Sequence, residues 1–205
     1  MYTGTEFELY LLKPNQANMK KIMIISVLAG LSALTACTKL KQLANIDVNI
    51  PYSQQISVPT IPGGVSGTPI PGGLTVPFPA VGFATNSKQY IAQYHTSANK
   101  IISVGLNSLA LQILSPSGQN FDFLDNVDVY ISSQTQPEML LASDIDIPKG
   151  QTTLNLVTAT DVNLKNYFID DTIYFRMTAH INAVPFSGTQ LEMSSIFNLL
   201  ANPLD

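Results

Sequence analysis

The sequence predicts an all-β fold, namely an antiparallel immunoglobulin-like β-sandwich with one or two short helices. Apolar and polar residues alternate with period two in several segments, which predicts strands that bury one face only. Such segments recur every 10 to 15 residues or so, roughly the spacing of an all-β domain, with turn signals between them. Alternation argues against a parallel sheet, whose strands are covered on both faces. We expect edge strands and a loop in residues 44–86, followed by the sandwich domain in residues 87–205.

The first predicted strand begins after residue 44. Apolar and polar residues alternate over Ile46–Ile50, and the apolar pattern returns at Ile56 and Val58. Pro51 interrupts the pattern and cannot donate a main-chain hydrogen bond to a neighbouring strand. The segment is therefore either an edge strand or a strand broken at the proline.

A run rich in proline and glycine extends from Pro59 to Pro79. The motif Ile-Pro-Gly-Gly occurs at residues 61–64 and again at residues 70–73. Prolines favour extended backbone and glycine pairs permit turns. We interpret the run as a loop between two strands, with Leu74–Val76 in the second. The alternative is a peptide-like ligand or a linker.

Residues 88–94 predict a short helix. Asn86 or Ser87 can cap its first turn, and Tyr90 and Tyr94 lie on one face because they are four residues apart. We interpret the two tyrosines as packing residues. Stacking on a ligand such as a sugar is the alternative.

Two sets of alternating apolar residues follow, out of phase with each other: Ile102, Val104 and Leu106, then Leu109, Leu111 and Ile113. A shift of one residue would turn the second set away from the core. A bulge or corner near Asn107–Ser108 restores the register, because it adds one unpaired residue to the strand.

The remaining elements carry their own boundary signals. Turns are predicted at Ser115–Gly118, Pro148–Gly150 and Pro185–Gly188. Strands are predicted around Val127–Ile131, Met139–Ile147, Leu154–Leu156, Thr172–Ile181 and Leu191–Leu199. We expect Asp161 to cap a short helix that runs through Tyr167–Phe168 and ends at Asp170–Asp171.

A different pattern precedes the β-rich region. Met19 is followed by Lys20 and Lys21, then by a mostly apolar run over residues 22–34. Charged start, apolar run and small residues before a cysteine are typical of a secretory signal, here residues 19–36. The run is shorter than the roughly 20 apolar residues that a membrane-spanning helix needs. We expect a cleaved signal helix, with residues 1–18 as an upstream extension of the reading frame.

Residues 34–37, Leu-Thr-Ala-Cys, resemble the lipobox of bacterial lipoproteins. The resemblance implies that the chain is cut before Cys37, that this residue carries the acyl groups, and that residues 37–43 form a tether. Thr38 and a basic tether further imply an outer-membrane lipoprotein facing the periplasm. A hydrophobic cysteine in an uncleaved anchor is the alternative.

The chain from Cys37 onward is acidic. It keeps seven basic and twelve acidic residues, a net charge of −5. This balance predicts neither nucleic-acid binding nor a polybasic patch for anionic lipid. The lipid on Cys37, the only cysteine in the sequence, must then supply the affinity for the membrane.

Residues 100–199 look like a poorly characterised group of bacterial lipoproteins. The resemblance rests on Ser115–Leu124 (SPSGQNFDFL) and the strands that follow. The strand order is also similar, more distantly, to the water-stress (WHy-type) sandwiches, although Ser115–Ser117 replaces their Asn-Pro-Asn turn. Neither resemblance implies catalytic residues.

Few residues suggest chemistry. His95 and His180 are the histidines, and no G-x-S-x-G motif is present. The aspartates at 122, 125, 128, 144 and 146 could bind Ca²⁺ at loop ends, but they lack the EF-hand spacing. We interpret these aspartates as a solvated acidic rim and His180 as a surface residue of a strand. We therefore expect no cofactor and no metal site.

Two functions from different classes remain. The first is a membrane-anchored, non-catalytic binding or structural module with a protein or glycan partner. The second is an envelope hydrolase whose site forms only in three dimensions, with His180 or His95 beside a carboxylate and a serine. Because no nucleophile–base motif is present, we expect the chain not to be an enzyme.

Overall fold

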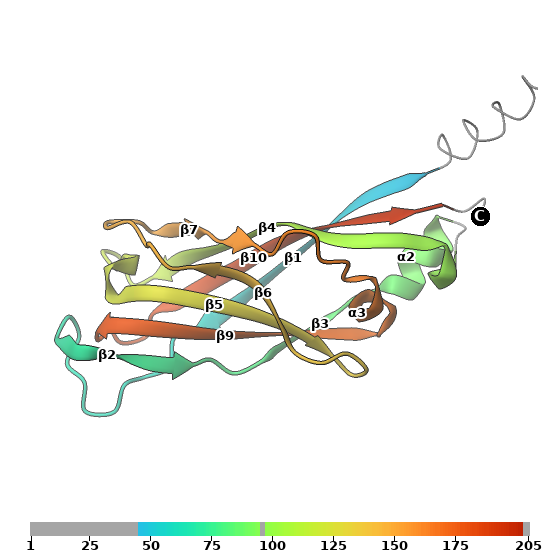
Figure 1. The fold of residues 1–205 in the computed structure, drawn as a ribbon. Helices are drawn as coiled ribbons and strands as arrows, with labels where there is room; N and C mark the ends of the chain where they lie inside the picture. Colours follow the sequence, from blue (N-terminus) through green and yellow to red (C-terminus); the bar gives the residue numbers. More distant parts are fainter. Residues whose placement is uncertain (1–44, 95–96, 203–205) are drawn as a thin grey trace, which may run out of the picture. The chain divides into compact units, whose positions relative to one another are not determined.

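The computed structural model describes residues 45–94 and 97–202, and every element in it belongs to one unit, Asn45–Asp205. This unit consists of two antiparallel sheets packed face to face (Figure 1). The first sheet has the order β1 (Ile46–Ser57), β10 (Gln190–Ala201), β4 (Ile101–Ser115) and β7 (Thr153–Asn155). The predicted antiparallel sandwich is confirmed.

The second sheet is built around β9 (Thr172–Ala183). Both β2 (Pro69–Pro77) and β3 (Val81–Ala84) pair with one edge of β9. On the other side follow β5 (Leu124–Ser133), β6 (Met139–Asp144) and β8 (Val157–Thr158). The predicted strands of residues 44–86 therefore lie at the edges of the same two sheets.

The strand order differs in detail from that of an immunoglobulin sandwich. The strands of an immunoglobulin sandwich are lettered A to G in chain order. Strand B pairs with E in one sheet and C pairs with F in the other, so the partners of B and C follow in the same order as B and C themselves. Here the pairing is nested, since β5 pairs with β9 and β4 pairs with β10. Nested antiparallel pairs divided between two sheets are the arrangement of a jelly roll.

β1 is a single unbroken strand of 12 residues that pairs with β10 over its whole length. Pro51 lies opposite Ile196 within this ladder. Because proline has no N–H to donate, it is tolerated where its nitrogen faces the free edge. The edge-strand interpretation is confirmed, and the break at Pro51 is wrong.

The second Ile-Pro-Gly-Gly motif lies inside β2 and not in a loop. The pairing jumps from Pro69–Ala183 to Leu74–Ile181, which leaves residues 70–73 as a bulge. Gly72 and Gly73 have φ values of +78° and +69°, in the region that glycine adopts most easily. The predicted loop is therefore confined to the residues before Pro69.

β4 contains the bulge that its sequence predicts. Ser108 pairs with Ile196 and Leu106 pairs with Phe197, so Asn107 is the extra residue. A further shift occurs near the start of β4, where Ile101 is buried and Ile102 is exposed. The assignment of Ile102 to the core is therefore wrong, because this second shift turns its side chain outward.

The chain from β6 to β8 crosses between the sheets. β6 ends at Asp144, three residues earlier than predicted, and Ile145 is exposed. Leu154 belongs to β7 in the first sheet, whereas the next strand, β8, pairs with β6 in the second. Leu154 and Leu156 are both buried, so this crossing closes one side of the core.

Four short helices complete the described part: α2 (Ser87–Gln93), η1 (Ala98–Lys100), η2 (Phe121–Phe123) and α3 (Lys165–Ile169). The two predicted helices correspond to α2 and α3. The cap predicted for α3 is wrong, because Asn163, and not Asp161, accepts a hydrogen bond from the Lys165 N–H at 3.0 Å. Asp161 instead occupies a left-handed turn with φ of +61°.

The core between the sheets is organised around a cluster of aromatic rings. Phe197 of β10 has its ring centroid 5.8 Å from that of Tyr52 and 4.8 Å from that of Phe168. Phe175 of β9 lies 6.0 Å from the same ring. Phe197 therefore joins both sheets and α3, in the spacing at which aromatic pairs attract.

We expect Phe197→Ala to lower the free energy of unfolding by about 3–5 kcal/mol, because a ring that is 0% exposed leaves a cavity among three others. Urea denaturation followed by circular dichroism measures the loss. Ile196→Ala is the matched control, since the adjacent side chain is 41% exposed on the outer face and should change stability much less. Equal losses for the two variants would contradict the packing described here.

Candidate functional site

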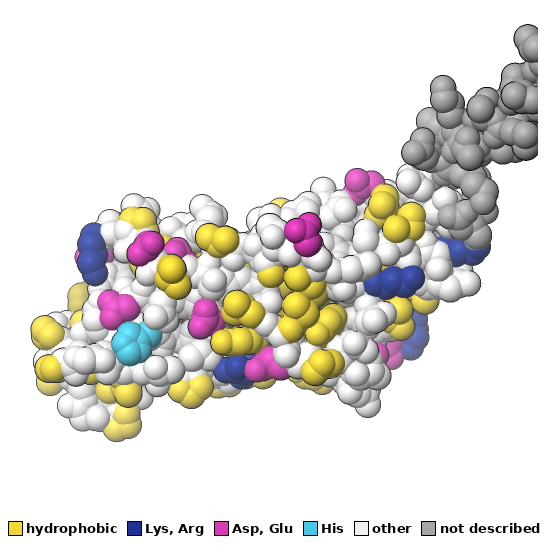
Figure 2. Space-filling view, in the orientation of Figure 1, with side chains coloured by type: hydrophobic (Ala, Val, Ile, Leu, Met, Phe, Trp, Pro, Cys, Tyr) yellow, Lys and Arg dark blue, Asp and Glu magenta, His cyan; other side chains and the backbone are white. Residues whose placement is uncertain are grey.

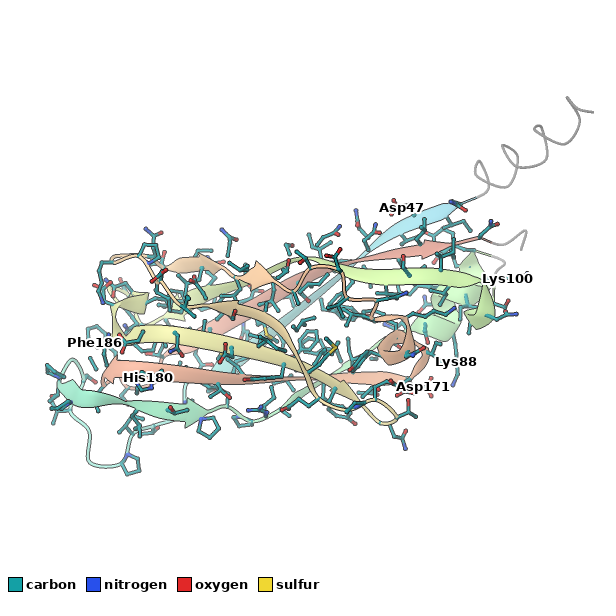
Figure 3. The ribbon with its side chains drawn as sticks, viewed as in Figure 1. Asp47, Lys88, Lys100, Asp171, His180 and Phe186 are labelled. Atoms are coloured by element: carbon teal, nitrogen blue, oxygen red, sulfur yellow. The ribbon has the colours of Figure 1, made fainter. Side chains whose placement is uncertain are left out.

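A groove lies at the end of the sandwich where the β1–β2 and β9–β10 connections meet. It encloses about 380 Å³, counting its open mouth, and is lined by residues 58–61, Gly64, Ser66 and residues 184–188. No lining residue carries a charge. Figure 3 shows Phe186 at this end of the sheets, opposite the end at which β1 begins.

Main-chain hydrogen bonds tie the two walls of the groove together. The Gly67 N–H donates to the Val184 carbonyl at 2.8 Å, and the Val184 N–H donates to the Thr68 carbonyl at 2.9 Å. The Val58 N–H donates to the Thr189 carbonyl at 2.9 Å. The walls therefore form one hydrogen-bonded unit, although more than 100 residues separate them in sequence.

Hydrogen bonds to its main chain hold Phe186 at the rim of the groove. Its N–H donates to the side-chain oxygen of the buried Gln119 at 2.7 Å, and its carbonyl accepts from the Thr189 hydroxyl at 2.6 Å. The next residue, Ser187, donates its N–H to the Ser66 hydroxyl at 3.2 Å. The main chain of Phe186 is thus fixed while its side chain remains 41% exposed.

The start of α2 is fixed by a buried threonine. The Thr85 hydroxyl donates to the Asp170 carbonyl at 2.7 Å and accepts from the Ser87 N–H at 3.3 Å. The Thr85 carbonyl accepts from the Tyr52 hydroxyl, whose burial raises the pKa of that phenol. Asn86 occupies the N-cap position but makes no side-chain cap bond.

A second hollow, of about 360 Å³ with its mouth, lies beneath α2. It is bounded by the helix and by the ends of β1, β4 and β10. Tyr90, Ile91 and Tyr94 line it, and Tyr90 and Ile91 pack against the core. The packing interpretation of Tyr90 is confirmed, and Tyr94 borders the same apolar space.

His180 does not meet the requirements of the hydrolase hypothesis. Its Nδ1 lies 3.2 Å from the Thr75 hydroxyl, and its Nε2 lies 3.9 Å from the Asp125 carboxylate. The ring is at the surface of β9, beside acidic side chains (Figure 2), and its Nε2 end lies close to Gly73, where a Cβ would clash with it. It has no serine among these contacts. The other histidine, His95, lies outside the described residues.

Two carboxylates of the predicted acidic rim bond to nearby main chain, and two others, Asp125 and Asp128, lie on β5. Asp122 accepts from the Gly150 N–H at 2.6 Å, and Asp144 accepts from the Asp146 N–H at 3.2 Å. Within residues 45–94 and 97–202, no three His, Cys, Asp or Glu residues converge in a way that could hold a metal ion. These contacts give Asp122 and Asp144 a structural role in the local main-chain conformation.

Arg176 is the centre of a polar cluster on the outer face of the second sheet. It forms a bidentate pair with Glu138, at 2.6 and 2.7 Å, and lies 4.5 Å over the Tyr130 ring. The hydrogen bond from Arg176 holds the pKa of Glu138 below its ordinary value of 4.5. Both side chains stay partly exposed, so the cluster stabilises the face without forming a pocket.

The predicted lipid-attachment residue Cys37, the signal segment and the tether lie outside the described residues. Among the residues that the structure does describe, no helix is long and apolar enough to cross a bilayer.

No known protein family matches the chain, and no characterised protein matches its sequence. Among solved structures, a chain of Desmodium yellow mottle tymovirus is similar over 76% of this chain and 89% of that one. The sequence identity is 11% and the TM-score is 0.22. At this level the similarity supports no inference about function.

We expect Thr85→Val to lower the free energy of unfolding by about 1–3 kcal/mol, because the Asp170 carbonyl and the Ser87 N–H lose a buried partner. Hydrogen exchange should show faster exchange in α2 than in the strands. Thr153→Val, at an exposed position of β7, is the control. Unchanged exchange in α2 would contradict the anchoring role of Thr85.

The Glu138–Arg176 pair predicts a pH dependence. Because the folded-state pKa of Glu138 is lowered, the pair stabilises the fold above pH 4.5 and loses this effect as the pH falls through the lowered value. Glu138→Gln should cost up to about 1 kcal/mol at pH 7, as for a partly exposed pair, and less at pH 3.

Urea titrations at both pH values measure this difference. The control is Glu192→Gln, which removes a carboxylate that accepts from the Ser53 hydroxyl instead of from an arginine. A cost of Glu138→Gln that is the same at pH 7 and pH 3 would exclude the ion pair as its source.

Proposed function

We propose that the chain is a lipoprotein of the bacterial envelope, anchored through acyl groups on Cys37, that acts as a non-catalytic binding module. The observation that carries the proposal is the Leu34–Cys37 lipobox pattern after an apolar run of secretory length. Two or more acyl chains hold a protein stably at a bilayer without a spanning helix. Thr38 and the basic tether support the outer membrane, facing the periplasm.

The groove supports binding rather than catalysis. Its lining contains no histidine, cysteine, lysine or carboxylate that could act as acid, base or nucleophile. It does contain hydroxyl groups, carbon surface and a fixed main chain. Loops held on a rigid scaffold are where binding residues most often lie.

The position of the groove also suits an anchored module. β1 begins nine residues after Cys37 and runs directly to the groove, which starts at Val58. A strand of 12 residues spans about 37 Å between its first and last residues. The groove is therefore presented well beyond the point at which the chain enters the sandwich.

We expect Cys37→Ser to abolish acylation and leave an uncleaved precursor, because a serine hydroxyl does not provide the thiol to which the acyl groups attach. Mass spectrometry of the membrane fraction measures both the mass of the acyl groups and the position of the new N-terminus. Thr35→Ser, which keeps a small residue within the lipobox, is the control and should be processed normally.

The opposite results would contradict the proposal. A Cys37→Ser product that is still cut before residue 37 would show that the cleavage does not depend on the cysteine, as cleavage at a lipobox should. Wild-type protein found in the soluble fraction with an unmodified thiol would exclude the lipid anchor altogether.

A further inference from the structure

We propose that the groove beside Phe186 binds an uncharged saccharide. This inference rests on the proposed function as a binding module and names the chemical class of its ligand. The groove combines a half-exposed aromatic ring with several hydroxyl groups, and its lining carries no charge.

The absence of charge in the lining selects for a neutral ligand. A carboxylate, phosphate or ammonium group that entered the groove would lose hydration without meeting an opposite charge. The charged groups at Asp125 and His180 belong to the outer face of the second sheet and do not line the groove. A ligand rich in hydroxyl groups loses much less hydration free energy, because the serine and threonine hydroxyl groups of the groove can replace the water molecules that it gives up.

The side chains of the groove match the two kinds of surface that a sugar ring presents. The face of a pyranose carries C–H groups, which pack on the exposed Phe186 ring. Its edge carries hydroxyl groups, which can exchange hydrogen bonds with Thr60, Ser66 and Ser187 because each serine or threonine is both donor and acceptor. Apolar contact with a few polar groups is the usual composition of a small-molecule site.

An extended peptide fits the groove less well. Peptides that add to a sheet need free main-chain donors and acceptors along one edge. Here the main chains of the two walls bond to each other, at Gly67, Thr68 and Val184 and again at Val58 and Thr189. Side-chain hydroxyl groups and one ring remain for recognition, which favours a saccharide.

The site is also organised before a ligand arrives. Gln119 and Thr189 fix both main-chain groups of Phe186, and Ser66 accepts from the following N–H. Binding therefore has to order little more than the phenyl ring itself. A site fixed in this way loses less entropy on binding, which matters for a ligand that forms weak individual contacts.

The sequence contains no tryptophan, which allows a direct test. Phe186→Trp keeps an aromatic face and introduces the only indole into the protein. We expect the emission of the detergent-solubilised, full-length mature variant to shift when an uncharged hexasaccharide of glucose, mannose or galactose is added. A hexasaccharide of galacturonic acid and a proline-rich peptide serve as the charged and peptide probes.

Retention of the wild-type protein on the immobilised hexasaccharides gives an independent measurement. Phe186→Ala should weaken this binding about tenfold or more, as truncation of a central aromatic contact does. Tyr174→Ala is the matched control, because the Tyr174 side chain is also 41% exposed but lies on β9 away from the groove. It should bind like the wild type.

Binding to an uncharged hexasaccharide that is lost in Phe186→Ala and kept in Tyr174→Ala would support the inference. Binding to none of the three, equal binding by both variants, or a preference for the acidic saccharide or the peptide would overturn it. The result is separate from the lipid anchor, because the mass spectrum of the same preparation shows whether Cys37 is acylated.

Discussion

The fold depends on the two central strands, β9 and β10, and on the short connection between them. β10 pairs on both sides within the first sheet, and β9 pairs on both sides within the second. Their inward side chains, such as Phe175 and Phe197, meet in the aromatic cluster between the sheets. The connection carries Phe186, so the rim of the groove is attached to the most constrained strands of the molecule.

Much of this architecture follows from local patterns in the sequence. Alternation predicts strands whenever one face is buried, and the phase change between Leu106 and Leu109 locates the bulge at Asn107 because the core admits only one register. The strand through Pro51 and the shift at Ile102 are less predictable, since both depend on the neighbour across the ladder. Likewise, the hydrogen bond from the Lys165 N–H at the start of α3 goes to Asn163, whose side-chain oxygen also accepts from the Val104 N–H of β4.

The groove could not be predicted from the sequence because no motif marks it. Its walls come from residues 58–66 and 184–188, and main-chain hydrogen bonds join them. Almost any residue can make such bonds, because only proline lacks the N–H donor. A search for reactive residues leads instead to His180 and the aspartates, which the structure places on an open face or in turns. The proposed anchor is the reverse case, because the pattern that predicts it, Leu34–Cys37, is found in the sequence and lies outside the described residues.

β1 leads directly into the groove, and it therefore links the two ends of the sandwich mechanically. β1 pairs with β10 without a register shift from Ile46 to Ser57, and the chain enters the groove at the next residue. A ladder without a break contains no hinge, because bending it would require hydrogen bonds to open along its length. In the proposed anchored protein, the groove and the start of β1 would therefore move as one body, and lengthening the predicted tether, residues 37–43, should extend the reach of the groove without altering its lining.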